Sequence, residues 1–171
     1  ASDVQLDLET SDVDLALRYA MPAGATQGGI RLFGEQLAVV ASPWLLKSGK
    51  PLRTPADVAQ FTLIEAGDAH RTHYLEYLSW RRWFDTRDLT KLQPQRWLYF
   101  NYAHQIVQAA LAGQGLALAR MPLIADALAA GDLVEVLPGH RIDSPLAYWL
   151  MVGPRSAQRP EIKAFCAWLQ V

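Results

Sequence analysis

The sequence lacks the features that would assign it to several large functional classes. It contains one cysteine in 171 residues, so it can form neither an internal disulfide nor a multi-cysteine metal site. It has no apolar run of about 18 residues, the length that a membrane-spanning helix needs. The net charge is −1, so the chain has no basic field of the kind that attracts a phosphate backbone. We therefore expect this chain itself to contact neither a membrane nor nucleic acid.

Local motifs for catalysis and cofactor binding are also missing. There is no Gly-x-Ser-x-Gly elbow, no Walker-type phosphate loop and no His-Glu-x-x-His zinc motif. His70 and His73 have helical metal spacing but no nearby acidic or cysteine cluster, so a surface pair is the better interpretation. Cys166, in the sequence KAFCAWL, fits a buried helical thiol, although a triad assembled across the chain stays open. We predict no enzyme activity, no cofactor and no metal.

The residues that are present indicate a globular α/β protein. Hydrophobic residues make up 51% of the chain, enough to bury a core. The clearest unit lies in Phe100–Arg120, where Asn101 is a good N-cap and apolar residues then recur at helical spacing. Gly113 suits the helix end, and Leu116–Ala119 suits a strand buried on both faces. This unit would direct a helix N-terminus at the edge of a parallel sheet, where open α/β folds bind ligands.

Similar patterns recur along the chain and favour alternating strands and helices with mostly parallel sheets. The predicted strands are Val4–Leu8, Val13–Leu17, Ile30–Phe33, Gln36–Ala41, Phe61–Ile64, Arg96–Phe100, Leu133–Leu137 and Leu146–Val152. Helices are predicted to begin at Ser42-Pro43, Thr54-Pro55 and Met121-Pro122, and a last one to cover Pro160–Leu169. The aromatic residues Tyr74, Tyr77, Trp80, Trp83 and Phe84 have roughly helical spacing and are predicted to face the core.

The first two predicted strands are unusually close together. Only Glu9–Asp12 separate them, and a crossover between parallel strands needs a dozen or more residues. Either these strands form a hairpin, or about ten connecting residues are missing from this chain.

Several of these segments, in this order, resemble the regulatory domain of LysR-type transcriptional regulators. The resemblance is carried by DVDLALRY (Asp12–Tyr19), LAVVASP (Leu37–Pro43), TPADV (Thr54–Val58), VQAALAGQGLAL (Val107–Leu118), GDLVEVLP (Gly131–Pro138) and YWL (Tyr148–Leu150). The Tyr148–Leu150 strand is most similar to the subgroup that contains glycine-cleavage and β-lactamase regulators. The segments span nearly the whole chain, so the resemblance applies to all of it.

The resemblance implies a fold of two Rossmann-like α/β subdomains with a cleft between them, like type II periplasmic binding proteins. Subdomain I would hold residues 1–42 and 146–171, and subdomain II would hold residues 43–145. The family's first strand and first helix would precede Ala1, so subdomain I is expected to be incomplete at its N-terminus.

The implied function is that of an effector-sensing domain. A small molecule would bind in the cleft, and the domain would form a homodimer or homotetramer in the cytoplasm. DNA would be bound only through a helix-turn-helix domain that this chain does not contain. A periplasmic solute-binding protein is the alternative, since it shares the architecture, and a signal peptide would favour it. A bilobal transferase would need a cofactor-bearing cysteine in a loop, whereas Cys166 is predicted on a helix.

Two groups of residues are candidates for the effector site. The predicted helix N-terminus contributes Asn101, Tyr102, Ala103 and His104, whose amides can bind a carboxylate or another anion. Alternatively, Asn101 only caps the helix and Tyr102 only packs.

The remaining candidates are Arg18, Tyr19, Glu65 and Tyr148. By resemblance, Tyr148 matches an effector-contacting strand position, although a partly buried aromatic role is equally compatible. Arg18 and Tyr19 follow a strand end that would open toward the cleft. Arg18 can pair with a ligand anion, or with an acidic side chain such as Asp14 or Glu35. Glu65 follows the first strand of subdomain II, and a solvated loop position is the cautious interpretation.

Overall fold

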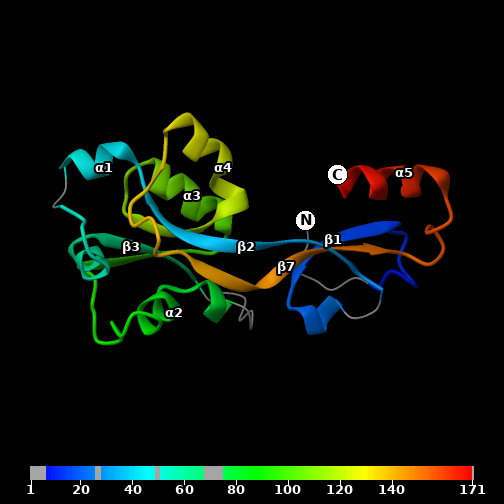
Figure 1. The fold of residues 1–171 in the computed structure, drawn as a ribbon, viewed down its shortest axis with the longest axis horizontal. Helices are drawn as coiled ribbons and strands as arrows, with labels where there is room; N and C mark the ends of the chain where they lie inside the picture. The colour runs from blue at the N-terminus through cyan, green and yellow to red at the C-terminus, as the bar shows by residue number, and fades with distance from the viewer. Residues whose placement is uncertain (1–6, 26–27, 49–50, 68–74, 171) are drawn as a thin grey trace. The chain divides into compact units, whose positions relative to one another are not determined.

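A computed structural model of the chain describes residues 7–25, 28–48, 51–67 and 75–170. The chain divides into two compact units, which we call unit 1 (Ala1–Gly34 and Pro145–Val171) and unit 2 (Glu35–Ser144). Strands β2 (Ile30–Ala41) and β7 (Ile142–Val152) each contribute to both units (Figure 1). The predicted subdomain limits after residues 42 and 145 stay a prediction.

Unit 2 contains a mixed sheet with the strand order β2-β5-β3-β4 and with β6 beside β2. Besides β2, its strands are β3 (Thr62–Ala66), β4 (Arg96–Phe100), β5 (Leu116–Arg120) and β6 (Val134–Glu135). β3 pairs parallel with β4 and β5, whereas β2 pairs antiparallel with β5 and β6. The predicted parallel pairing therefore holds only for β3, β4 and β5. These strands are linked by long helix-containing segments, which parallel crossovers require.

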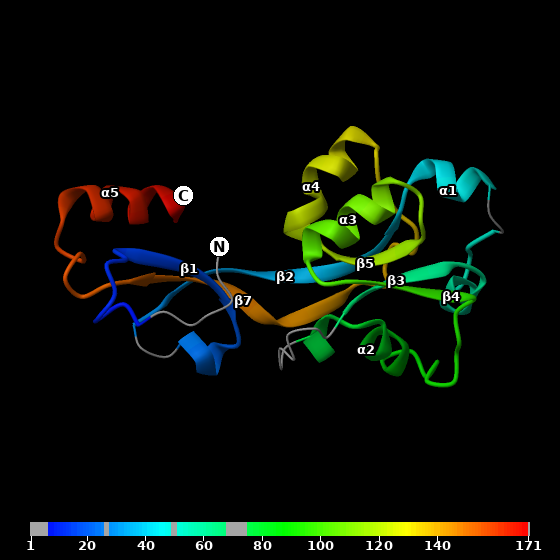
Figure 2. The same ribbon diagram turned by 180° about the vertical axis from the view of Figure 1, so that it is seen from behind.

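Helices cover both faces of this sheet and create two cores. The helices of unit 2 are α1 (Pro43–Ser48), α2 (Trp80–Asp85), α3 (Ala103–Leu111) and α4 (Met121–Ala130), with 3-10 turns at Pro55–Gln60 and Leu75–Leu78. α3 and α4 lie on one face, and α2 lies on the other (Figures 1 and 2). Trp80 and Trp83 are fully buried in the α2 core, and Phe84 is nearly so. The core-facing prediction is thus confirmed for these three aromatics, whereas Tyr74 lies outside the described residues.

Helix ends follow the local sequence signals with one exception. The predicted starts of α1 and α4 and both ends of α5 are confirmed, and Gly113 and Gly131 adopt positive φ at helix ends, as predicted. The prediction that Asn101 caps α3 is wrong, because the N-cap is Tyr102. The ladder between β3 and β4 continues to a hydrogen bond from the Gly67 amide to the Phe100 carbonyl (2.7 Å). Tyr102 keeps an extended backbone (φ −126°, ψ 143°), so the helix starts only at Ala103.

Unit 1 contains an antiparallel pairing between β1 (Leu15–Ala20) and β7, with β2 next in strand order. It also contains a 3-10 turn at Pro22–Ala25 and the helix α5 (Pro160–Leu169). Residues 9–12 form a turn stabilised by Asp7, which accepts hydrogen bonds from the Glu9 and Ser11 amides. Most of the predicted strand Val4–Leu8 lies outside the described residues, as do His70 and His73.

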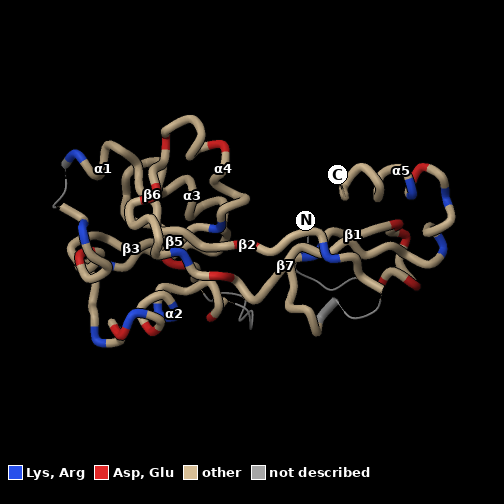
Figure 3. The backbone as a smooth tube through the Cα atoms, viewed as in Figure 1, with Lys and Arg blue, Asp and Glu red and all other residues tan. Residues whose placement is uncertain are grey.

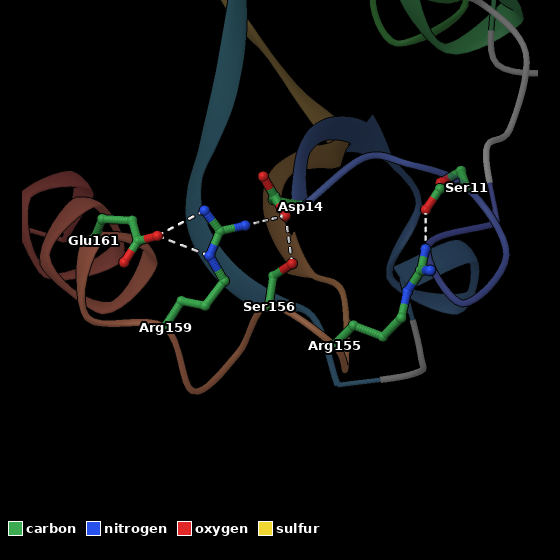
Figure 4. Close-up of polar contacts among 6 residues, drawn as sticks. All are labelled: Ser11, Asp14, Arg155, Ser156, Arg159 and Glu161. Carbon is green, nitrogen blue, oxygen red and sulfur yellow. Dashed lines mark hydrogen bonds and ion pairs between the residues drawn. The ribbon is translucent and has the colours of Figure 1, made fainter.

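Polar contacts join the start of β1 to the loop before α5. Asp14 accepts hydrogen bonds from the Ser156 hydroxyl and from Nη1 of Arg159 (2.9 Å), and Arg159 also pairs with Glu161 (Figure 4). The Gly153 amide donates to the Asp14 carbonyl (2.8 Å). These contacts connect the two chain segments that make up unit 1.

Candidate functional site

In unit 2, the carboxyl ends of β3, β4 and β5 meet at one edge of the sheet. Ala66 lies beside Phe100 at this edge, and Gly67 and Asn101 follow them. A Cβ atom at Gly67 would lie 3.2 Å from Oδ1 of Asn101, so the Asn101 side chain lies directly over this glycine. This edge, with the N-terminus of α3 above it, is where an open α/β sheet binds ligands.

The start of α3 brings together the predicted residues Asn101, Tyr102, Ala103 and His104. The Tyr102 amide donates to Oε1 of Gln105 (3.3 Å), which completes the N-terminal turn. The rings of Tyr102 and His104 stack with centroids 5.7 Å apart, and Tyr102 is 48% exposed. First-turn amides of a helix have no partner within the helix, and they carry partial positive charge. This end of α3 can therefore offer free amides to an anionic or strongly polar group, next to the stacked rings of Tyr102 and His104.

Glu65 belongs to a different part of unit 2. Ile64 and Ala66 pack in the core beneath α3, whereas Glu65 points to the α2 side and accepts a hydrogen bond from the Trp80 amide (3.2 Å). Burial raises the pKa of Glu65 to about 7, against the opposing effect of the bonds from the Trp80 and Ala66 amides. The carboxyl is therefore half-protonated near neutral pH.

An ion pair that the sequence did not predict lies at the same end of the sheet. Nε of Arg120 donates to Oε1 of Glu35 (2.8 Å), and the Glu35 side chain is fully buried. The two residues are 85 positions apart, so no local pattern identifies the pair. Asp14 pairs with Arg159 and Glu35 with Arg120, so both acidic side chains that the sequence offered to Arg18 have another basic partner, and the pairing of Arg18 itself stays a prediction.

In unit 1, the aromatic candidates form a cluster. Tyr19 lies opposite Tyr148 across β1 and β7, with ring centroids 5.0 Å apart. The ring of Phe33 on β2, a residue that the sequence analysis did not single out, has its centroid 4.6 Å from the centroid of the Tyr148 ring. Arg18 lies opposite Trp149 and therefore faces the other side of the sheet. The sequence predicted that Arg18 and Tyr19 follow a strand end, whereas both lie inside β1 and, as consecutive strand residues, face opposite sides of the sheet. Their role at the effector site stays a prediction.

The described residues contain neither a metal-binding cluster nor a membrane-spanning helix. No three His, Cys, Asp or Glu side chains among them come together in a way that could hold a metal ion. Within the same residues, no helix has the length and apolarity needed to cross a bilayer. Acidic and basic residues are interspersed along both units (Figure 3), and Cys166 lies on α5 as predicted.

Comparison with known proteins identifies the family of this chain. The model of the LysR substrate binding domain matches residues 1–171. The chain belongs to the LysR substrate-binding domain family. This LysR domain is 32% identical over 169 residues to the glycine cleavage system transcriptional activator of Escherichia coli K12, covering 99% of this chain and 52% of that protein. It thus spans about half the length of the curated relatives it matches.

Solved structures agree with this assignment. The effector domain of the transcriptional regulator AmpR of Pseudomonas aeruginosa matches the LysR domain with a TM-score of 0.71 and 26% identity, over 96% of this chain and 74% of that one. The AmpR effector binding domain of Citrobacter freundii has the same TM-score at 22% identity. The predicted resemblance and the periplasmic-binding-protein-like fold of type II are confirmed.

Proposed function

We propose that this LysR domain is the effector-sensing part of a bacterial transcription regulator. The observation that carries the proposal is the match of the family model to the whole chain, supported by relatives that are transcriptional regulators. The complete protein would act in the cytoplasm as a homodimer or homotetramer. It would bind DNA through a helix-turn-helix domain outside this chain, and it would catalyse no reaction.

The effector would bind at the N-terminus of α3. Its acidic or polar group would accept hydrogen bonds from the amides of Ala103 and His104, and Tyr102 and His104 would contact it with their rings. Asn101 would position this turn through its contact above Gly67. These roles are supported by the geometry of α3, whose start is exposed at Tyr102.

Unit 1 would contribute to effector recognition through the aromatic cluster of Tyr19, Phe33 and Tyr148. The Tyr148 hydroxyl would donate a hydrogen bond to the effector, and the neighbouring rings would supply apolar contact area. Arg18, which faces the other side of its sheet, would support the site indirectly.

Regulation would follow from differential binding. An effector shifts the balance between two conformations only by the difference in its affinity for them. Binding that favours one arrangement of the domain would change how the complete dimer or tetramer holds its DNA-binding domains.

DNA binding by the complete gene product separates this proposal from a periplasmic solute-binding protein. We expect the complete protein to retard a DNA fragment from upstream of its own gene in a gel-shift assay. The present chain alone should not retard it, because its net charge is −1. A complete protein that carries an export signal and does not bind DNA would favour the solute-binding alternative.

A further inference from the structure

Unit 2 contains a cavity on its α2 side that the proposed effector site does not use. The cavity has a volume of about 440 Å³ and lies among α2, the segment after α2, and the strands β3 and β4. Its deeper lining is formed by Glu65, Phe84, Leu92 and Trp97, and its exposed rim by Arg81, Asp85, Thr90, Gln93 and Tyr99. This volume lies within the range typical of small-molecule sites.

Glu65 is the ionisable group in the deeper lining. Its Oε2 atom accepts the Trp80 amide (3.2 Å), which fixes the carboxyl at the carboxyl end of β3. Trp80 is itself fully buried and donates its indole Nε1 to the Ile64 carbonyl (2.9 Å), so the partner that orients Glu65 is rigidly held. A charged ligand group that reaches Glu65 thus meets a preorganised carboxyl.

Aromatic rings form the wall beside this carboxyl. Tyr99 lies beside Glu65 in the parallel pairing of β3 and β4, and the rings of Trp97 and Tyr99 are stacked with centroids 6.1 Å apart. Phe84, which belongs to α2, also lines the cavity. Aromatic faces attract cations, and they attract them more strongly where water is excluded.

The charges around the cavity also favour a cation. The lining contains two carboxyls, Glu65 and Asp85, and one guanidinium, Arg81. Glu65 lies deeper than the two exposed rim charges. A buried carboxylate would repel an anion that entered the cavity. An ammonium group would instead donate hydrogen bonds to Glu65, in place of the water that the carboxylate loses on burial.

We propose that this cavity binds a small organic ammonium ion, with the charged nitrogen on Glu65 and the carbon part against Phe84, Trp97 and Tyr99. The site is distinct from the start of α3. Binding depends on the ionised form of Glu65, whose pKa burial raises to about 7, so the ligand displaces a proton near neutral pH. The other titratable groups that line the cavity are Arg81, Asp85 and Tyr99.

Benzylammonium is a suitable probe because it combines one aromatic ring with one primary ammonium group, which is mostly protonated at pH 8. We expect calorimetry to show millimolar or tighter binding at pH 8, at least tenfold weaker binding at pH 5.5, and no comparable binding of benzoate. Glu65→Gln should abolish binding at pH 8, whereas Asp85→Asn on the rim should change the affinity by less than about threefold. Tyr102→Ala should leave the affinity for benzylammonium unchanged, which separates this site from the proposed effector site.

A second measurement does not depend on the variants. The indole N–H resonance of Trp97 should shift on titration with benzylammonium, while that of the exposed Trp168 on α5 should not. The proposal is overturned if benzylammonium does not bind, if benzoate binds as well, if Glu65→Gln retains full affinity, or if the Trp97 signal does not respond.

Discussion

At the scale of single residues, the Glu65 carboxyl links folding to pH independently of any ligand. Its pKa is about 7 in the folded chain against a usual value of 4.5, because burial disfavours the ionised form. The folded state therefore binds the proton more tightly than the unfolded state. The stability that Glu65 contributes is fully present below pH 4.5 and is lost as the pH rises through 7.

The replacement Glu65→Gln tests this link. Between pH 5 and pH 8, the wild type should lose at most about 3 kcal/mol of unfolding free energy relative to the variant, since each pKa unit corresponds to about 1.4 kcal/mol. Urea titrations of both proteins at the two pH values measure the difference, and other titrating groups cancel in the comparison. An equal pH response of the two proteins would show that Glu65 titrates normally.

Residue positions were predictable where they depend on local geometry. Tyr102, Ala103 and His104 were assigned to a helix start from the sequence pattern alone, and they lie at the start of α3; their roles in effector binding stay a prediction. The ion pair of Glu35 and Arg120 was not predictable, because it joins residues 85 positions apart. The direction of Glu65 depends on which face of β3 meets α2, and the sequence of β3 does not reveal this.

At the scale of elements, two glycines have different reasons for being glycine. A Cβ at Gly115 would collide with the Thr62 carbonyl, because β5 begins close beside β3. Gly131 ends α4 at φ +79° and has open space around its Cβ position. The first position excludes a side chain by crowding, and the second disfavours one only through its backbone conformation.

Alanine substitutions should separate these two effects. We expect Gly115→Ala to cost about 2–3 kcal/mol of unfolding free energy, since the clash is with backbone. Gly131→Ala should cost about 1 kcal/mol, and Gly131→Asn less, because Asn tolerates the left-handed region. Chemical denaturation of the three variants measures these losses. A Gly115→Ala protein as stable as Gly131→Ala would contradict the close approach of β3 and β5.

Element types were more predictable than element lengths. Proline in the first turn and glycine after the last helical residue marked α4 correctly. β2 is one strand of twelve residues, although the sequence suggested two pieces around Gly34. β2 lies between β7 and β5 in the sheet, and its Glu35 side chain is buried in an ion pair with Arg120. These partners are distant in the sequence, so the local pattern around Gly34 does not predict one continuous strand.

At the scale of the whole molecule, the family was recognisable because its motifs occur in order along the chain. The α/β class followed from the alternation of predicted strands and helices, and the type II fold followed from the family resemblance; both are confirmed. Strand direction was predicted less well. β1 pairs antiparallel with β7 across more than 120 residues, and neither strand's own sequence specifies the direction of such a pairing.

Our central proposal is that the start of α3 and the aromatic cluster around Tyr148 each contribute to the recognition of a small effector. Its most direct test is a screen of metabolites against the domain by thermal shift and calorimetry. Only compounds that also bind the Glu65→Gln variant are followed up, so that binding in the cavity around Glu65 is excluded. We predict that at least one compound raises the melting temperature. Tyr102→Ala and Tyr148→Phe should each weaken its binding by tenfold or more, whereas the exposed control Leu123→Ala should not. Full binding of that compound by both tyrosine variants would contradict the account.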